Sequence, residues 1–496
     1  MKRNHYFIVV AGGVYSYLFY QQSSGLNFFV FSLLLVVLAW VSNRQAAQSP
    51  LWLSVAAGTL LTGFATFLWG DNLAVFANLV SLLLLAAITH SPYASLVVAL
   101  LQTCTSFVMA VPDMLGNKQP ADNADSPGIS PAVKKAILTF LPMVVVLVFF
   151  VLYRSSNPLF ANVTDNIDLS FISPAWFICT ATGLYLMYVF FTPQTIAYLT
   201  KADQDNSDTL SYIGNNERDK TVIAQVMSYT SEVYTCVLLL AMLNMLVFAV
   251  NGIDAYYLFI IRKLPDDMTW SEYLHDGTNG LIVSIMLAVV IILFYFNGHL
   301  NFSADNRKLR RLAGLWVVQN IFLVVTTTQR NWFYISEYGL THKRIGVMVF
   351  LWLCVAGLVL TLIKVVQVKN NWFLFRKNAW VLYLTIVACS LVNRDSIIAS
   401  HNIALARRTD KPLDEYYLNH LSANSLVTLF EEYRNEKSLP AAKRIFSSSL
   451  VAQMKVRYYA YLENRKAWQS YNYTTYQIKT SIPQLIRDDK YLNRPE

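Results

Sequence analysis

The stretch IGVMVFLWLCVAGLVLTLIKVV, residues 345–366, decides which kind of fold this chain can adopt. Its 22 residues carry a single charge, Lys364, close to the end. A helix of this length rises about 33 Å, which matches the roughly 30 Å of hydrocarbon in a lipid bilayer. The stretch therefore predicts a membrane-spanning helix.

Comparable apolar blocks of 16 to 29 residues recur through the first 392 residues. With 55% hydrophobic and 14% charged residues and a mean hydropathy of +0.39, the 496-residue chain is too apolar for a soluble globule. We predict an all-α, polytopic transmembrane helical bundle of about 11–12 spans over residues 1–392. The first block resembles a signal peptide but lacks a small-x-small cleavage site, so we interpret it as a retained helix. The predicted spans are 6–21, 26–42, 51–69, 73–89, 93–112, 136–153, 174–192, 222–250, 278–297, 312–329, 345–366 and 376–392.

The composition changes abruptly after Val392 and becomes polar. We predict a small, mainly helical extramembrane domain over residues 393–496. Its candidate helices are 413–433 and 440–468, where apolar residues recur at helical spacing. In the second of these helices the predicted buried stripe consists of Leu450, Met454, Tyr458 and Leu462.

The net charge of +9 comes mainly from Lys and Arg in short loops and in the tail. This distribution indicates contact with membrane lipids rather than with nucleic acid. With all twelve blocks counted as spans, thirteen Lys and Arg lie on the face of the two termini and fourteen on the other. If the first block does not cross, the balance becomes eleven against sixteen, and the tail is predicted outside the cytoplasm. The side of the C-terminal domain stays open.

The chain shows no motif for catalysis, a cofactor or a metal ion. Its five cysteines lie inside apolar blocks without a CxxC pair, and the apolar blocks lack HExxH, GxSxG, Walker and dinucleotide-binding sequences. We therefore expect no cofactor, no metal and no catalytic residue. An intramembrane enzyme that uses His275 with Asp276 or Glu337 is a further alternative.

Loops separated by an even number of spans lie on the same face of a membrane. This condition joins residues 262–277, residues 330–344 and the start of the tail. Their polar side chains form our candidate ligand-binding site. The site residues are His275, Asp276, Arg330, Glu337, Tyr338, Lys343, Arg344, Arg394, Asp395 and His401, with His342 beside them.

Some of these residues have a simpler structural interpretation. Asp276 directly precedes a predicted helix, so its carboxylate can cap the helix N-terminus. His275 can be an interfacial polar residue, a proton-handling group or a metal ligand. Amide side chains inside the spans are costly in lipid, so we expect them to face other helices. They are Asn244, Asn251, Asn297, Gln319 and Asn320.

The basic sequence HKR, residues 342–344, stands at a predicted helix N-terminus, where the helix dipole disfavours cations. A negative group should compensate. Glu337 or Asp395 could do so within the protein. Alternatively, the helix end and its basic residues could hold an anionic ligand such as a lipid phosphate or a carboxylate, or the side chains could extend to the interface.

Four passages resemble a known bacterial family. They are GLNFFVF at 25–31, YLHDGTNGLIVSIMLA at 273–288, YISEYGLTHKRIGV at 334–347, and NRDSIIASHNIALA at 393–406 followed by LDEYYLNHLSANSLVTL at 413–429. The chain resembles the family called domain of unknown function 4173, which is related to domain of unknown function 4153. The resemblance implies a polytopic membrane protein without an established activity. The residues that it picks out are Tyr338, Gly339, Leu340, Thr341, Arg344, Asn393, Asp395, Asn402 and Tyr417.

Two functions fit these observations. The first is a multi-pass protein of the bacterial inner membrane that binds or transports a small or lipid-like anionic molecule. The second is a membrane-anchored sensor or assembly scaffold whose C-terminal domain binds a protein partner. Twelve spans exceed what an anchor needs, whereas the lack of acidic residues deep in the predicted spans argues against proton-coupled transport.

Overall fold

The computed structural model describes residues 2–114, 173–193, 196–210, 229–261, 270–296, 306–409, 411–437 and 444–487, with Pro440 and isolated residues between 146 and 160. Within these residues the secondary structure is helical, apart from one isolated bridge between Thr209 and Lys369. The expected all-α fold is therefore confirmed. The chain divides into two compact units, which we describe separately.

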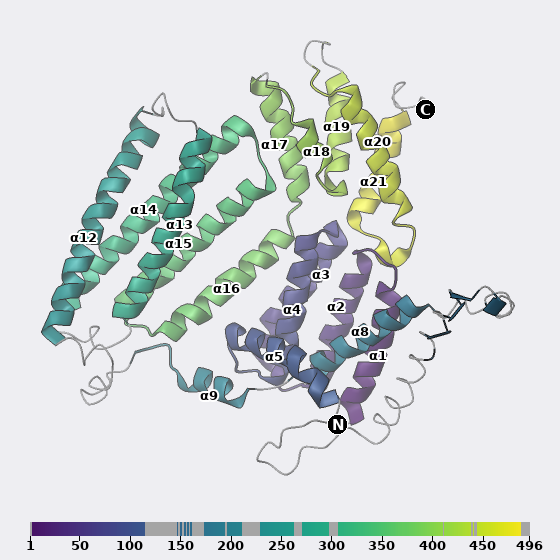
Figure 1. Ribbon diagram of the computed structural model, residues 1–496, viewed down its shortest axis with the longest axis horizontal. Coiled ribbons are helices and arrows are strands. Elements are labelled where there is room, and N and C mark those ends of the chain that lie inside the picture. Colours follow the sequence, from purple (N-terminus) through teal and green to yellow (C-terminus); the bar gives the residue numbers. More distant parts are fainter. Residues whose placement is uncertain are drawn as a thin grey trace. The chain divides into compact units, whose positions relative to one another are not determined.

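Unit 1 comprises Met1–Lys201, Cys389–Leu391 and Tyr459–Thr480. Its helices pack side by side along their lengths (Figure 1). They are α1 (Lys2–Phe19), α2 (Leu26–Ser42), η1 (Ala46–Gln48), α3 (Pro50–Trp69), α4 (Asn72–His90), α5 (Leu96–Met114), α8 (Pro174–Phe191), the start of α9 (Ala197–Asp205), η6 (Trp468–Ser470) and the first part of α21 (Tyr473–Arg487).

The helices of unit 1 meet through small and polar side chains. Asn78 of α4 donates to Ser32 Oγ on α2 (2.8 Å) and to the Thr59 carbonyl on α3 (3.2 Å). All three of these residues are fully buried. Gly63 lets α3 approach closely, because a Cβ there would lie 2.9 Å from Ser32 Oγ. Close backbone contact and interhelical hydrogen bonds are the usual means by which helices associate in lipid.

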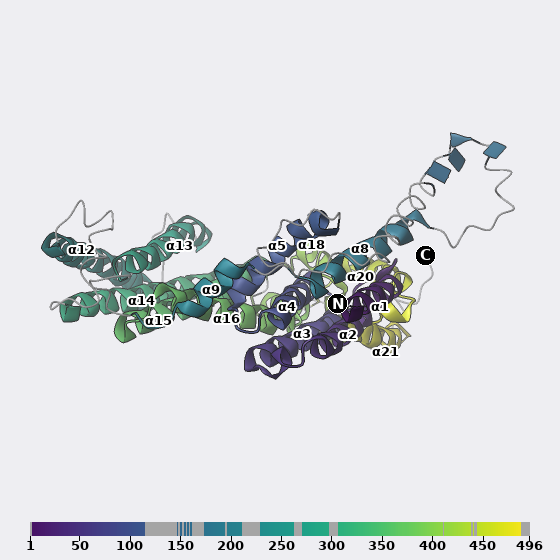
Figure 2. The ribbon, with the colours of Figure 1, turned by 90° about the horizontal axis from the view of Figure 1, so that it is seen from below.

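Unit 2 comprises Ala202–Ala388, Val392–Tyr458 and Ser481–Glu496. In Figure 2, α12 and α13 form one layer, which lies over α14 and α15. Its helices are the end of α9, α12 (Tyr229–Ala255), the π-helical segment η2 (Tyr256–Ile261), α13 (Trp270–Tyr295), α14 (Asn306–Tyr338), α15 (His342–Gln367), most of α16 (Asn371–Ser390), α17 (Arg394–Thr409), α18 (Glu415–Asn419), η4 (Ala423–Ser425), α19 (Leu426–Lys437) and most of α20 (Ser448–Glu463).

Six of the described helices are long and apolar enough to cross a membrane, which confirms a multi-pass architecture. They include α15, which contains the apolar stretch 345–366. Helices α16 and α17 pass the same test only as a pair, bent by 67° at the break between them. Since α17 has 16 residues and four Arg and Asp side chains, it is too short and too charged to be a span by itself. The six are Pro50–Trp69, Asn72–His90, Pro174–Phe191, Ser231–Ile261, Arg307–Tyr338 and His342–Gln367.

One contact contradicts the predicted count of spans. Trp69, the last residue of α3, donates from its indole Nε1 to the carbonyl of Leu391, just past α16 (3.0 Å). Both residues belong to unit 1. The twelve-block prediction places nine spans between them and therefore puts them on opposite surfaces. The contact requires an even number of crossings, so the prediction of nine is wrong. The block 136–153 lies almost wholly outside the described residues.

The helices after Val392 differ from those expected. The predicted helix 413–433 is interrupted between α18 and α19, where Ser422 caps η4 by accepting a hydrogen bond from Asn424 N. The second helix begins at Ser448 rather than at 440. In it Leu450, Met454 and Tyr458 are buried as predicted, whereas Leu462 is half-buried. Helices α17 and α21 had no counterpart in the prediction.

Candidate functional site

The candidate site in unit 2 is built on the turn between α14 and α15. Helix α14 ends at Tyr338, and Gly339 turns the chain with a φ of +82°. Thr341 then caps α15 by accepting a hydrogen bond from Arg344 N (3.4 Å). Glycine adopts positive φ readily and a capping threonine satisfies a free helix N–H, so the sequence YGLT favours this turn.

The amide of Asn402 on α17 holds the turn from the other side. Its Oδ1 accepts from Leu340 N (2.6 Å), and its Nδ2 donates to the Leu340 carbonyl (2.9 Å). A Cβ at Gly339 would lie 2.8 Å from Asn402 Oδ1. Position 339 therefore needs glycine both for its backbone conformation and for the close approach of Asn402.

The positive charge of Arg344 is compensated by backbone carbonyl groups. Its guanidinium donates to the carbonyls of Tyr338 (2.8 Å) and Gly339, and it lies 4.1 Å from the centroid of the Tyr334 ring. These carbonyls belong to the negative end of the α14 dipole. Of the two acidic residues expected to compensate the basic segment 342–344, Asp395 pairs with His342, whereas Glu337 pairs with Lys411 (2.5 Å).

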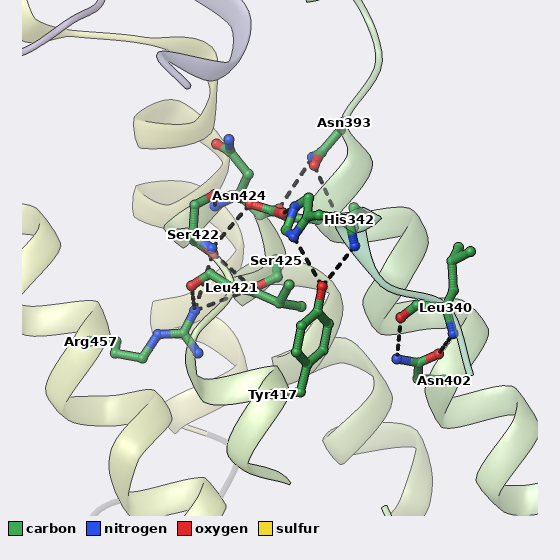
Figure 3. A network of polar contacts seen from close by, with 12 residues as sticks. Leu340, His342, Asn393, Asn402, Tyr417, Leu421, Ser422, Asn424, Ser425 and Arg457 are labelled. Atoms are coloured by element: carbon green, nitrogen blue, oxygen red, sulfur yellow. Dashed lines mark hydrogen bonds and ion pairs between the residues drawn. The ribbon is translucent and has the colours of Figure 1, made fainter. Parts of the chain in front are cut away.

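A short ion pair connects α15 with α17. His342 Nε2 donates to Asp395 Oδ1 (2.5 Å), an arrangement that an ionised carboxylate requires because it can only accept. Tyr417 joins them, since its hydroxyl accepts from His342 N (2.8 Å) and lies 3.0 Å from His342 Nδ1 (Figure 3). The second oxygen of Asp395 accepts from both the backbone N (3.0 Å) and the hydroxyl of Ser422. Asp395 thus links three elements.

The surroundings of Asp395 change its acidity. Burial alone would raise the pKa of its carboxyl, but the hydrogen bonds from His342 and Ser422, together with the charge of His342, outweigh burial and lower that pKa below the ordinary 3.8. Burial also raises the pKa of the Tyr417 hydroxyl. The carboxylate is therefore ionised at neutral pH, and the phenol is neutral.

Arg457 of α20 completes the arrangement. Its guanidinium donates to the carbonyls of Leu418 (3.2 Å), Leu421 (2.8 Å) and Ser422 (3.1 Å), at the end of α18 (Figure 3). A guanidinium offers several donors in a fixed plane, which suits such a cluster of carbonyls. We call the set of His342, Asn393, Asp395, Asn402, Tyr417, Ser422 and Arg457, with the turn 339–341, the junction.

The structure brings together part of the predicted site. Tyr338, Arg344 and Asp395 belong to the junction or contact it, and Lys343 is exposed beside them. His401 Nδ1 lies 3.5 Å from Asn402 Oδ1. Arg394 is half-buried in the first turn of α17.

His275 and Asp276 lie within α13, whose first residue is Trp270. Asp276 is therefore not at the helix N-terminus, and the interpretation of this residue as a cap is wrong. The side chains of both residues lie outside the described part of the structure. The predicted span began at residue 278, where the apolar run starts. Helix α13 begins earlier, because the mostly polar residues 271–277 form its first turns.

Arg330 is absent from the junction. It lies inside α14, buried, and forms an ion pair with Asp254 of α12, with both side chains 5% exposed. Thr326 donates a further hydrogen bond to Asp254 (3.0 Å). Sequence reasoning missed Asp254 because the predicted span stopped at 250, whereas the candidate span continues to Ile261. Arg330 was expected in a loop, but α14 extends to Tyr338.

The ion pair ends a polar seam between α12 and α14. Gln319 donates to Asn244 Oδ1 (2.9 Å), Asn244 donates to the Leu312 carbonyl (3.1 Å), and Asn251 donates to the Gln319 carbonyl (2.9 Å). The contacts advance by seven residues on both helices, so these helices run parallel. Asn244, Asn251 and Gln319 face another helix as predicted. Asn320 bonds within its own helix, and Asn297 lies outside the described residues.

Comparisons with known proteins identify a family but no characterised relative. The model of the family described as Domain of unknown function (DUF4153) matches residues 7–431. This match covers the polar seam and all of the junction except Arg457, and it confirms the resemblance seen in the sequence. No curated protein and no solved structure matches the chain.

Proposed function

Since this chain belongs to the uncharacterised DUF4153 family, we propose its function from its own geometry: it binds or moves a small or lipid-like anionic molecule across the bacterial inner membrane. The observation that carries the proposal is the buried pair of Asp254 and Arg330 between two candidate spans. Arg330 would contact the anion, and Asp254 would be its partner in the resting state.

Physical cost supports a functional role for this pair. Two ions removed from water lose hydration that their mutual attraction repays only in part, and apolar replacements of such pairs are often as stable or more stable. Ionisable groups inside a membrane are correspondingly rare and tend to mark ligand or ion pathways. Arg330 lies eight residues before the end of α14, about 12 Å along the helix from Tyr338. An anion that enters from this end therefore has a short way to travel.

The test uses charge-neutral variants of the pair. We would measure the thermal unfolding of the purified protein with inorganic phosphate, a dicarboxylate and phosphatidylglycerol. A ligand that binds the folded state raises the unfolding temperature. One of these anions should stabilise the wild type, should stabilise Asp254→Asn more strongly because Arg330 is released, and should leave Asp254→Asn/Arg330→Gln unaffected.

Arg344→Gln is the matched control, because backbone carbonyls already occupy its guanidinium. It should keep the anion response of the wild type. An equal response of the wild type and the double variant to every anion would sink the proposal.

The junction favours a second candidate, a sensor or assembly scaffold whose C-terminal region binds a protein partner. Asp395, His342 and Tyr417 direct their polar groups at one another, which holds α17–α20 against the start of α15. Exposed Tyr416 and Val456 on this region are suitable positions for photoreactive side chains in living cells. A discrete cross-linked partner that disappears in His342→Ala would support the scaffold. The same cross-link in both proteins would argue against a role for the junction.

The charges near the helix ends support an orientation with the C-terminal region outside the cytoplasm. Trp69 and Leu391 share one surface, and chain connectivity brings α17 to it as well. Among the described residues of unit 2, the helix ends away from the junction carry eight Lys and Arg against six near it, and cytoplasmic ends are enriched in these residues. The eight are Arg307, Lys308, Arg310, Arg311, Lys364, Lys369, Arg376 and Lys377. The six are Lys343, Arg344, Arg394, Arg407, Arg408 and Lys411.

A further inference from the structure

Near its C-terminus, the chain returns to the ends of the first helices in unit 1. Leu26 N donates to the Tyr471 carbonyl (2.8 Å), and Ser23 N donates to Ser470 Oγ (2.9 Å). Arg465 donates to the carbonyls of Ser24 (2.6 Å) and Ser470 (2.7 Å). These bonds fasten η6 to the turn between α1 and α2.

The same segment caps the end of α3. Thr474 Oγ1 donates to the Leu68 carbonyl (3.3 Å), and Asn472 Nδ2 approaches the Trp69 carbonyl (3.5 Å). The last carbonyls of a helix lack partners within the helix. Because α3 is a candidate span, we expect the residues that cap its end at the depth where hydrocarbon gives way to headgroups.

Exposed aromatic side chains gather on this segment. Trp468 is 48% exposed and Tyr476 is 51% exposed. The Trp468 ring lies 6.3 Å from that of Tyr17 on α1, and Tyr473 lies 6.3 Å from Trp69. Aromatic rings with a polar group are enriched at headgroup depth, where one part is apolar and the other is wet.

These aromatic side chains lie next to the exposed face of α1. On α1 the exposed residues recur at helical spacing as Tyr6, Val9, Val10 and Tyr17, the pattern of a lipid-facing stripe. Trp468 lies at the end of this stripe, beside Tyr17. The exposed Lys466 and Lys479 add positive charge, which anionic headgroups attract. The opposite face of α21 is buried through Ile478 and Ile482.

We propose that η6 and the first half of α21 form a membrane-interface anchor, in which Trp468, Tyr473 and Tyr476 insert at headgroup depth and Lys466 and Lys479 contact lipid phosphates. The partner of this surface is the lipid headgroup region. The C-terminal region thus includes a segment that rests on the bilayer.

Depth measurements on the full-length protein in vesicles test the anchor. The five native cysteines are replaced, and a nitroxide label is attached singly at Trp468→Cys, Tyr476→Cys or Val456→Cys. Val456 is an exposed residue of α20, more than three turns before η6 in the chain, and serves as the aqueous control. The accessibility of the nitroxide to two reagents then reports its depth. Oxygen concentrates in the bilayer, whereas a polar nickel chelate stays in water.

We expect an oxygen-to-nickel accessibility ratio several-fold higher at 468 and 476 than at 456. Equal ratios at the three positions, or low access of both reagents at 468 and 476, would overturn the proposal. Lys466→Glu/Lys479→Glu should lower the ratio at 468 in vesicles that contain phosphatidylglycerol and leave it unchanged in pure phosphatidylcholine. The same change in both lipids would refute the phosphate contact.

Discussion

Gly339→Ala should destabilise the protein through the turn that begins the junction. Gly339 has a φ of +82°, and an added Cβ would lie 2.8 Å from Asn402 Oδ1. The left-handed conformation costs an L-residue about 1–2 kcal/mol. Displacement of Asn402 weakens its two hydrogen bonds to Leu340, each of which contributes about 0.5–1.5 kcal/mol. The expected loss in free energy of unfolding is therefore roughly 2–4 kcal/mol.

A nearby glycine provides the control for this variant. Gly346 lies in α15, and no heavy atom lies within 4 Å of a Cβ built there. Gly346→Ala should thus be neutral or stabilise by up to about 1 kcal/mol, since alanine loses less conformational entropy in a helix. Denaturant unfolding of both variants in detergent, followed by tryptophan fluorescence, measures the difference.

A double variant separates the two contributions at Gly339. In Gly339→Ala/Asn402→Ala the clash is gone, so the combined loss should be smaller than the sum of the single losses by about 1–2 kcal/mol. The backbone strain remains in this variant. The reasoning would be refuted if Gly339→Ala were as stable as Gly346→Ala, or if the two losses simply added.

Three further changes test other parts of the structure. Because the folded-state pKa of Asp395 is below 3.8, its stabilising contribution is complete above that pH and declines as the pH falls below it. The difference in unfolding free energy between wild type and Asp395→Asn should therefore shrink below pH 3.8, and a constant difference down to acid pH would contradict the assignment. Asn78→Ala should cost about 1–2 kcal/mol in the same assay, since it removes buried hydrogen bonds to Ser32 and the Thr59 carbonyl; unchanged stability would show that they contribute nothing. A membrane-impermeant maleimide should label Tyr416→Cys but not Lys369→Cys in spheroplasts, and the reverse pattern would place the C-terminal region in the cytoplasm.

The polar residues of the spans show the limit of sequence reasoning. The amides of Asn244, Asn251 and Gln319 were expected to face other helices, because an unsatisfied amide is costly in lipid wherever it lies. This cost depends on the residue type alone, so it can be predicted from the sequence. Asp254 could not be assigned to a span, because the apolar signal fades before it and its burial is explained by its contacts with Arg330 and Thr326 on another helix.

The basic residues at the start of α15 show the same limit. Positive charges at a helix N-terminus are disfavoured by the helix dipole, so the sequence indicated that a negative group must lie close to them. The compensating groups are backbone carbonyls of the preceding turn for Arg344 and the Asp395 carboxylate for His342. Carbonyls are present at every residue, so no pattern of side chains could identify them.

By itself the sequence determined that this protein is a helical, multi-pass membrane protein, because hydropathy over some twenty residues is a local property. Tertiary structure alone decided which helices pack against one another within each unit. A single hydrogen bond from Trp69 to Leu391, residues separated by 322 positions, overturned the predicted number of crossings between them. Contacts over such distances depend on how whole helices pack, and the sequence of either helix does not contain that information.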